Sequence, residues 1–341
     1  MSKIALQKIL LSIWFFVIIV GCSLEVADDK KSNNSDISHL KYNFGIDISD
    51  INRGYINYYS NNSLSKSNSS VTRAIIVIHG TNRDALDYFN VINDVTVDKL
   101  ESDNTIIIAP HFKEASDEAN SSEFQWSDKG GWKVGSNSTS KVSLDRISSF
   151  TIIDKMITTL SDENLFPNLT DIVITGHSAG GQFTQRYAFT SQIDKSLDKN
   201  FHYIIANSGS YLYLTNERVD NNGFSIPYTT CSSYNEYKYG LDNPYAYFVG
   251  EDNELLKNQY ISKKVIYLLG TDDTNIDTNL DTSCEANLQG DNRYERGLNY
   301  WNYINYLYFT NNHLLLKVKD IGHSKTGIYS STNGKMALFS K

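Results

Sequence analysis

Six short apolar runs recur along residues 74–320, and most of them are rich in β-branched side chains. Nearly every position in each run is apolar, which is typical of strands buried on both faces of a parallel sheet. The runs are Ala74–Gly80, Asn104–Pro110, Asp171–His177, His202–Ser208, Lys263–Gly270 and His313–Asp320.

Segments with helical spacing lie between these runs. The pattern predicts helices over Ser148–Leu160, Gly180–Ser191 and Arg293–Phe309, and an antiparallel edge hairpin over Leu40–Ser60. Alternating strands and helices indicate an α/β protein, with a mostly parallel central sheet flanked by helices. Ligands of such sheets bind beyond the carboxyl ends of the strands, so candidate chemistry is expected there.

The start of the chain has the pattern of an export signal. Lys3 and Lys8 precede the apolar run Ile9–Val20, whose 12 residues fall short of the ~20 that span a bilayer. We therefore predict a signal peptide over residues 1–21, with a membrane anchor helix as the alternative.

The stretch Ile19–Cys22 resembles the lipobox of bacterial lipoproteins. The resemblance implies cleavage before Cys22 and lipid attachment to it, which would hold the exported protein on a membrane. Conventional cleavage beside an unmodified Cys22 is the alternative. Residues 22–38 are polar and predict a disordered tether. Ser23 stands where an aspartate would resemble an inner-membrane retention signal, which favours the outer membrane if the cell is Gram-negative.

The remaining residues, 39–341, are within the size of a single α/β domain. The chain has a net charge of −8, and removing the two lysines of residues 1–21 leaves 29 basic and 39 acidic residues, or −10. An acidic chain without a basic stripe is not expected to bind nucleic acid. Cys231 and Cys284 can form a disulfide in an exported protein, and two buried thiols are the alternative.

The run Asp171–His177 leads into the pattern Gly-x-Ser-x-Gly, in which Ser178 stands between Gly176 and Gly180. A strand that turns abruptly into a helix brings two backbones close, and the glycines permit that approach. The turn lifts the hydroxyl to a helix N-terminus, where negative charge is stabilised. Ser178 is therefore a candidate nucleophile, with a solvated serine in a glycine-rich turn as the alternative.

A nucleophilic serine needs a base, and His323 is the best placed of the seven histidines. It lies in a glycine-bearing loop just beyond His313–Asp320, at the same sheet edge as Ser178. A neutral imidazole there can take the serine proton and return it to the leaving group. Asp272 and Asp273 follow the preceding run, and either one can orient the imidazole.

These residues together resemble the α/β-hydrolase superfamily, in its secreted esterase and lipase-like branches. The resemblance rests on Ser178 in "GHSAGG", the acid after the penultimate run, His323 after the last run and the segment Val77–Asn82, "VIHGTN". The chain order serine, aspartate, histidine is also that of these enzymes. The resemblance covers residues 71–328 and implies the α/β-hydrolase fold.

The same resemblance assigns further roles. Its spacing favours Asp273 over Asp272 as the triad acid. It implies that the backbone N–H groups of Thr81 and Ala179 form the oxyanion hole. The chain has "HGTN" where the lipase variant has "HGGG", which leaves Asn82 as a substitute donor.

Two aromatic regions are expected near the site. Residues 210–262 predict a cap inserted before the penultimate strand, and its segment Ser232–Phe248 is rich in tyrosine. These rings either offer flat faces to a substrate or pack the cap. Trp126 and Trp132 are candidates for the rim of the site, with the same packing alternative.

No metal or cofactor is expected. The segment Asp272–Glu285 alternates oxygen-bearing side chains like a calcium loop, but Thr278 and Cys284 stand where the glycine and the bidentate glutamate are needed. The sequence has no zinc motif with paired histidines or cysteines.

The sequence thus predicts a serine hydrolase that cleaves small-molecule or polymeric carboxylic esters through an acyl-enzyme on Ser178, without a cofactor. A serine peptidase or amidase with the same triad is the first alternative, because the triad serves both leaving groups. A lipoprotein that binds ligands on an inactive hydrolase scaffold is the second.

Overall fold

The computed structural model describes residues 40–48, 53–142, 145–245 and 247–339, all of which belong to the compact unit Ser38–Lys341. The predicted signal peptide, Cys22 and the tether lie outside the described residues. Among the helices of the described ranges, none is long and apolar enough to cross a bilayer.

Eight strands form the central sheet. They are β1 (Lys41–Asp47), β2 (Arg53–Ser60), β3 (Arg73–Ile78), β4 (Thr105–Pro110), β7 (Asp171–His177), β8 (Asn200–Ala206), β11 (Lys264–Gly270) and β12 (His313–Val318). Their spatial order is β1-β2-β4-β3-β7-β8-β11-β12. Strand β2 is antiparallel to both of its neighbours, and every other neighbouring pair is parallel. The predicted mostly parallel sheet and edge hairpin are confirmed.

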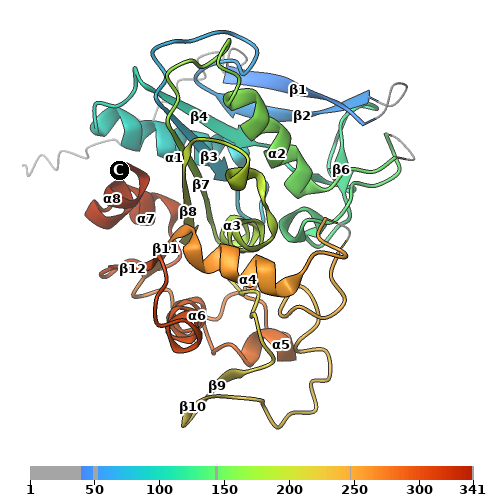
Figure 1. The fold of residues 1–341 in the computed structure, drawn as a ribbon, viewed down its shortest axis with the longest axis vertical. Helices are drawn as coiled ribbons and strands as arrows, with labels where there is room; N and C mark the ends of the chain where they lie inside the picture. Colours follow the sequence, from blue (N-terminus) through green and yellow to red (C-terminus); the bar gives the residue numbers. More distant parts are fainter. Residues whose placement is uncertain (1–39, 49–52, 143–144, 246, 340–341) are drawn as a thin grey trace, which may run out of the picture. The chain divides into compact units, whose positions relative to one another are not determined.

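Helices cover both faces of this sheet (Figure 1). They are α1 (Ala85–Asp98), α2 (Ser149–Leu160), α3 (Ala179–Thr190), α4 (Asn253–Ser262), α5 (Cys284–Asn287), α6 (Arg293–Leu307), α7 (Lys325–Ser330) and α8 (Thr332–Phe339). One face carries α1, α7 and α8, and the other carries α2, α3, α4 and α6.

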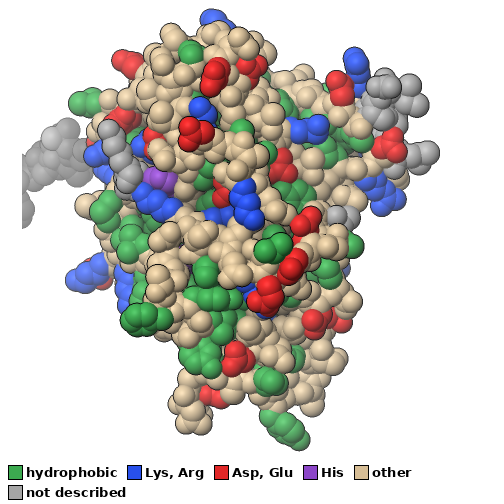
Figure 2. All heavy atoms as spheres, in the orientation of Figure 1, with side chains coloured by type: hydrophobic (Ala, Val, Ile, Leu, Met, Phe, Trp, Pro, Cys, Tyr) green, Lys and Arg blue, Asp and Glu red, His purple; other side chains and the backbone are tan. Residues whose placement is uncertain are grey.

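The loops contain short strands and 3₁₀ helices. They are the paired strands β5 (Lys113–Glu114) and β6 (Gln125–Trp126), the paired strands β9 (Arg218–Asp220) and β10 (Gly223–Ser225), and the 3₁₀ helices η2 (Gly131–Val134) and η3 (Ile193–Lys195). Basic and acidic side chains are interspersed on the face that Figure 2 shows.

The strand sequences are apolar throughout because helices cover both faces of the sheet. Successive side chains of a strand point to opposite faces of the sheet. In β3, Ile75 and Val77 pack with α1, whereas Ile76 and Ile78 pack in the core on the α2 and α3 side. Both faces of the strand are therefore buried, so polar residues do not alternate with apolar ones along it.

Five helices were not predicted from the pattern, namely α1, α4, α5, α7 and α8. The sequence of α1 contains several β-branched residues and several Asp and Asn residues, which have low intrinsic helix propensity. Burial of Tyr88, Phe89, Ile92 and Val95 against the sheet stabilises the helix instead. Tertiary packing thus overrides the local preference.

The tyrosine-rich segment before β11 packs mainly against the rest of the domain. The hydroxyl of Tyr237 donates to the carbonyl of Val134 in η2 at 2.7 Å, and the hydroxyl of Tyr239 donates to Asp281 at 2.6 Å. Both rings are buried. These contacts fasten the insertion between η2 and the loop that follows β11.

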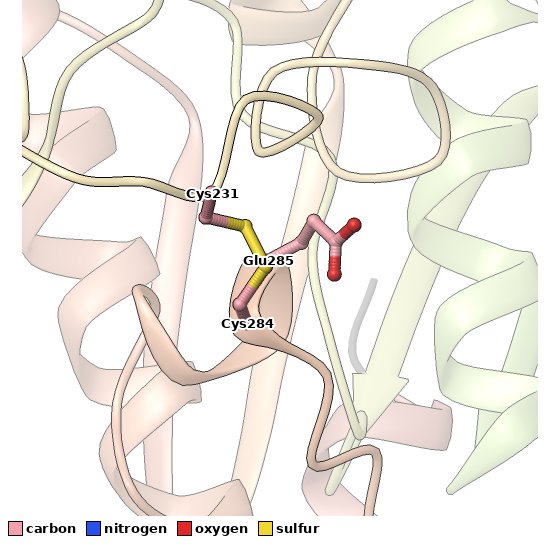
Figure 3. Close-up of side chains that lie close together, drawn as sticks. All are labelled: Cys231, Cys284 and Glu285. Carbon is pink, nitrogen blue, oxygen red and sulfur yellow. A yellow bond between two sulfur atoms is a disulfide. The ribbon is translucent and has the colours of Figure 1, made fainter.

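A disulfide joins Cys231 of this insertion to Cys284 at the start of α5, with the two Cα atoms 5.9 Å apart (Figure 3). The predicted pairing is confirmed. Beside it, the hydroxyl of Ser233 donates to Glu285 at 2.6 Å. The disulfide and this hydrogen bond connect the insertion to the end of the loop that begins after β11.

Removing the disulfide is expected to destabilise the fold substantially. The bond closes a loop of 53 residues in the unfolded chain, and the chain-entropy model gives a stabilisation of about 4 kcal/mol for a loop of this length. We therefore expect the Cys231→Ser/Cys284→Ser variant to unfold at a lower urea concentration than the oxidised wild type. An unchanged urea midpoint would contradict this expectation.

Candidate active site

Ser178 lies at the turn from β7 into α3 and has a backbone φ of 61° and ψ of −119°. Such a conformation is strained for a residue with a Cβ, and strain of this kind is concentrated at functional sites. A Cβ at Gly176 would overlap the carbonyl of Gly180, and a Cβ at Gly180 would overlap the carbonyl of Ile78. Both glycines are thus required for the tight turn that presents the serine.

His323 bridges the serine and an aspartate. Its Nε2 lies 2.9 Å from the hydroxyl oxygen of Ser178, and its Nδ1 lies 2.7 Å from Oδ2 of Asp273. Because a carboxylate accepts the Nδ1 proton, Nε2 of the neutral ring is free to accept the serine proton. Asp272 has no part in this chain of hydrogen bonds, since its side chain is exposed and accepts from Thr271.

The aspartate of this chain is buried beside an arginine. Asp273 is 1% exposed, and its second oxygen, Oδ1, lies 3.7 Å from the guanidinium of Arg293. Arg293 also donates two hydrogen bonds of 2.8 Å to Asp277, which holds the pKa of that carboxyl down at about 2. A buried carboxylate needs compensation of this kind, so Arg293 ties the Asp273 loop to α6.

Asn207 links the strand ends that carry the site. It follows β8, and its side-chain oxygen accepts from the N–H of Gly270 at 2.8 Å while its amide donates to the carbonyl of Gly322 at 3.2 Å. Gly270 ends the strand before Asp273, and Gly322 directly precedes His323. Asn207 is therefore a positioning residue for both Asp273 and His323.

The loop after β3 faces the serine. A cavity of about 160 Å³ is lined by both Thr81 and Asn82 of this loop together with Ser178 and His323. Ala179 is the first residue of α3, so its N–H lacks a partner within the helix. Of the predicted oxyanion donors, Thr81 lines the cavity beside Ser178, and Ala179 directly follows the serine with an N–H that is free of helical hydrogen bonding.

Arg83 holds the loop after β3 in place. Its guanidinium donates to the carbonyl of Thr81 at 2.8 Å and forms two hydrogen bonds to Asp117, of 2.6 and 2.9 Å. Because Arg83 holds the carbonyl of Thr81, the peptide unit that carries the N–H of Asn82, the substitute donor, is restrained. Neither Arg83 nor Asp117 has a motif that marks it in the sequence.

His79 orders the same loop as a neutral ring. Its Nδ1 donates to the carbonyl of Gly80 at 2.9 Å, and its Nε2 accepts from the N–H of Phe112 at 3.0 Å. Burial lowers its pKa to about 3. Trp132 packs on it with ring centroids 4.5 Å apart. Trp126 and Trp132 are 0% and 1% exposed, so their expected place on the rim is wrong and the packing alternative holds.

No protein-family model matches the chain, and neither does any curated protein sequence. Poly(aspartic acid) hydrolase-1 from Sphingomonas sp. KT-1 is similar in structure, with 23% identity, coverage of 86% of this chain and 97% of that chain, and a TM-score of 0.59. LpqC, a poly(3-hydroxybutyrate) depolymerase from Bordetella parapertussis, is 19% identical over 89% of this chain and 91% of its own, with a TM-score of 0.60. The chain has the α/β-hydrolase fold.

Within the α/β-hydrolase fold, the three candidate catalytic residues occupy the ends of three different strands. Ser178 follows β7, Asp273 follows β11 and His323 follows β12. Because these strands are parallel, their carboxyl ends share one edge of the sheet, and residues up to 145 positions apart in sequence meet there. The structure thus brings together the three residues that the sequence analysis selected.

Among the described residues, one group of His, Cys, Asp and Glu side chains is close enough to hold a metal, namely Cys231, Cys284 and Glu285. The two sulfurs are joined in the disulfide (Figure 3). They therefore cannot serve as the thiolate ligands that such a site would need.

Buried histidines are expected to make the α/β-hydrolase fold unstable in acid. Burial lowers the pKa of His79 to about 3, of His111, His202 and His313 to about 4, and of His177 well below 6.5. Between these values and the unfolded pKa of about 6.5, the unfolded state binds more protons, so stability falls as pH falls through this window.

We expect the free energy of unfolding to fall between pH 7 and pH 5, by roughly 1 to 2 kcal/mol for each of the two fully buried rings, His79 and His177. Urea unfolding at the two pH values, at constant ionic strength, measures the change. A midpoint that is equal or higher at pH 5 would contradict it.

Proposed function

We propose that this protein is a serine hydrolase that cleaves carboxylic esters through an acyl-enzyme on Ser178. The observation that carries the proposal is the position of His323, whose two ring nitrogens lie 2.9 Å from the Ser178 hydroxyl and 2.7 Å from the Asp273 carboxylate. A strained serine beside a correctly oriented imidazole is the arrangement that nucleophilic catalysis needs.

In the first half-reaction, Oγ of Ser178 attacks the ester carbonyl carbon while its proton moves to Nε2 of His323. The buried carboxylate of Asp273 stabilises the imidazolium that forms. The N–H groups of Ala179 and Thr81 stabilise the oxyanion, with that of Asn82 as the substitute for the second donor. Collapse of the tetrahedral intermediate expels the alcohol, which takes the proton from His323, and leaves the acyl group on the serine.

In the second half-reaction, His323 removes a proton from water as the water attacks the acyl carbon. The second tetrahedral intermediate collapses, the carboxylic acid leaves and Ser178 regains its proton. Water and ester thus yield acid and alcohol, and no cofactor takes part in either half-reaction. The same pair of oxyanion donors serves both intermediates.

The proposed substrates are small or polymeric carboxylic esters. The two similar solved structures are described as a poly(aspartic acid) hydrolase and a poly(3-hydroxybutyrate) depolymerase, which supports a polymer or its fragments as the class of substrate. Attachment to a membrane through a lipid on Cys22, on the exported side, is also proposed from the resemblance of Ile19–Cys22 to a lipobox.

Hydrolysis of matched 4-nitrophenyl esters and peptide 4-nitroanilides tests the reaction class. We expect release of nitrophenol from acetyl and butyryl esters, with little release of nitroaniline from the anilides. Rapid cleavage of the anilides would identify an amidase or peptidase instead. If a folded protein cleaves neither, the proposed function fails.

A further inference from the structure

Three cationic residues lie close together, about two helical turns along α3 from the candidate catalytic serine. They are Lys133 of η2, Arg186 of α3 and Lys238 of the inserted segment, and we call them the cationic cluster. Asp281 forms the one ion pair that the cluster makes with the described residues, to Lys238 at 3.3 Å. The cluster therefore has an excess of positive charge.

Arg186 is fully buried without a carboxylate within ion-pair distance in the described part of the chain. Its guanidinium donates to neutral oxygens at distances of 3.1 to 3.5 Å. The acceptors are the carbonyls of Lys133 and Lys238, the side-chain oxygen of Gln182 and the hydroxyl of Ser210. Burial of an arginine against neutral acceptors alone is costly, since its charge is not compensated.

The two lysines are more accessible than the arginine. Lys133 is half-buried, and its amine makes no hydrogen bond or ion pair with any residue that the structure describes. Burial, followed by the charges of Lys238 and Arg186, lowers the pKa of Lys133 to about 8. The side chain of Lys238 is 28% exposed. Both amines thus have donors available to a ligand.

Asp281 is largely engaged by other donors. Its carboxylate accepts from the hydroxyl of Tyr239 at 2.6 Å and from the N–H of Ser283 at 3.1 Å, in addition to the contact with Lys238. Glu114 and Glu285 act on Lys133 and Lys238 only from beyond ion-pair distance, so among the described residues Asp281 is the one close carboxylate for three cations. An anionic ligand would relieve the repulsion between Lys133 and Lys238 and supply the missing partner.

Helix α3 connects the cluster to the nucleophile. Ser178, Gln182 and Arg186 are spaced by four residues, so they lie on one face of the helix. At 1.5 Å per residue, Arg186 lies roughly 12 Å along the helix from Ser178. Gln182 stands between them and accepts hydrogen bonds from both Arg186 and Ser210.

Two further elements connect the cluster to the same site. Trp132, directly before Lys133, packs on His79 next to the oxyanion loop. Asn279 lines the cavity beside Ser178, and it lies two residues before Asp281. None of the three cations lines that cavity, so the cluster is separate from it.

We propose that Lys133 and Lys238, with Arg186 beneath them, form an anion subsite that binds a carboxylate on the acyl chain of the substrate. Because His323 returns its proton to the leaving group, the alcohol occupies the cavity beside His323. The acyl chain then extends away from His323, toward the cationic cluster, and places its carboxylate roughly 12 Å from Ser178. This inference rests on the proposed function and specifies the class of substrate.

Two 4-nitrophenyl esters of the same eight-carbon acyl chain test the subsite. One chain ends in a carboxylate and the other in a primary carboxamide, which has the same shape without the charge. Charge-assisted hydrogen bonds predict that wild-type kcat/KM is about 10- to 100-fold higher for the carboxylate ester. The Lys133→Met/Lys238→Met variant is expected to bring this ratio to about 1 and to keep its activity on the carboxamide ester.

The carboxamide ester also serves as the folding control for the double variant. Lys66→Met, in the exposed loop before β3, is the matched control and should keep the wild-type ratio. A wild-type ratio of 1 or less, or an equal loss of both activities in the double variant, would overturn the anion subsite while the hydrolase stands. If the wild type hydrolyses neither ester, the proposed function is overturned and the subsite with it.

Discussion

Replacing Ser178 or His323 with alanine is expected to lower kcat for a 4-nitrophenyl ester by about 10⁴- to 10⁶-fold, the range that triad removal gives in serine hydrolases. Each change removes one end of the 2.9 Å hydrogen bond through which the serine loses its proton. Without His323 the hydroxyl remains protonated, and without Ser178 there is no acyl-enzyme.

The two substitutions should not be additive, because each one alone disables the same step. The Ser178→Ala/His323→Ala variant is therefore expected to be no slower than the slower single variant. Thermal unfolding of each variant provides the control for folding. A single variant that retains a tenth or more of wild-type kcat would contradict the assigned roles.

The second large effect is expected at Asp273, where Asn should lower kcat by about 10⁴-fold. An amide at this position no longer requires the proton to be on Nδ1 of His323, so the ring can adopt the tautomer that cannot accept from Ser178. Asp272→Asn is the matched control, since the neighbouring side chain is exposed and lies outside the hydrogen-bonded chain.

Comparing kcat of Asp273→Asn with kcat of Asp272→Asn shows which of the two aspartates is the triad acid. A loss of activity confined to Asp273→Asn supports the geometry, in which Oδ2 of Asp273 lies 2.7 Å from the His323 ring. An equal loss in both variants would indicate general damage to the loop after β11. A loss confined to Asp272→Asn would contradict the assignment.

The sequence predicts those parts of the site that local patterns specify. The glycines around Ser178 are required by a close backbone approach within a few residues, so the motif marks the turn. His323 and an aspartate after the penultimate strand could be placed because parallel strands bring their carboxyl ends to one edge. The choice of Asp273 over Asp272 came from the spacing that the α/β-hydrolase resemblance implies. The apolar runs predicted the central strands because both sheet faces are covered.

Other parts of the site depend on contacts between distant segments and have no local signal. Asn207 acts through Gly270 and Gly322, and it would need the strand order to be recognised. Arg293 lies in an amphipathic helix pattern, where an arginine usually faces water, yet here it is buried beside Asp273. Helix α1 was missed because packing, and not propensity, stabilises it.

Labelling with a fluorophosphonate, followed by peptide mapping, tests the central claim most directly, because this reagent phosphonylates a serine only when a base has activated it. The account predicts one label per chain, located on Ser178, and none in Ser178→Ala or in denatured wild type. An unlabelled but well-folded wild-type protein, or a label on another residue, would contradict the claim that Ser178 is the nucleophile of a serine hydrolase.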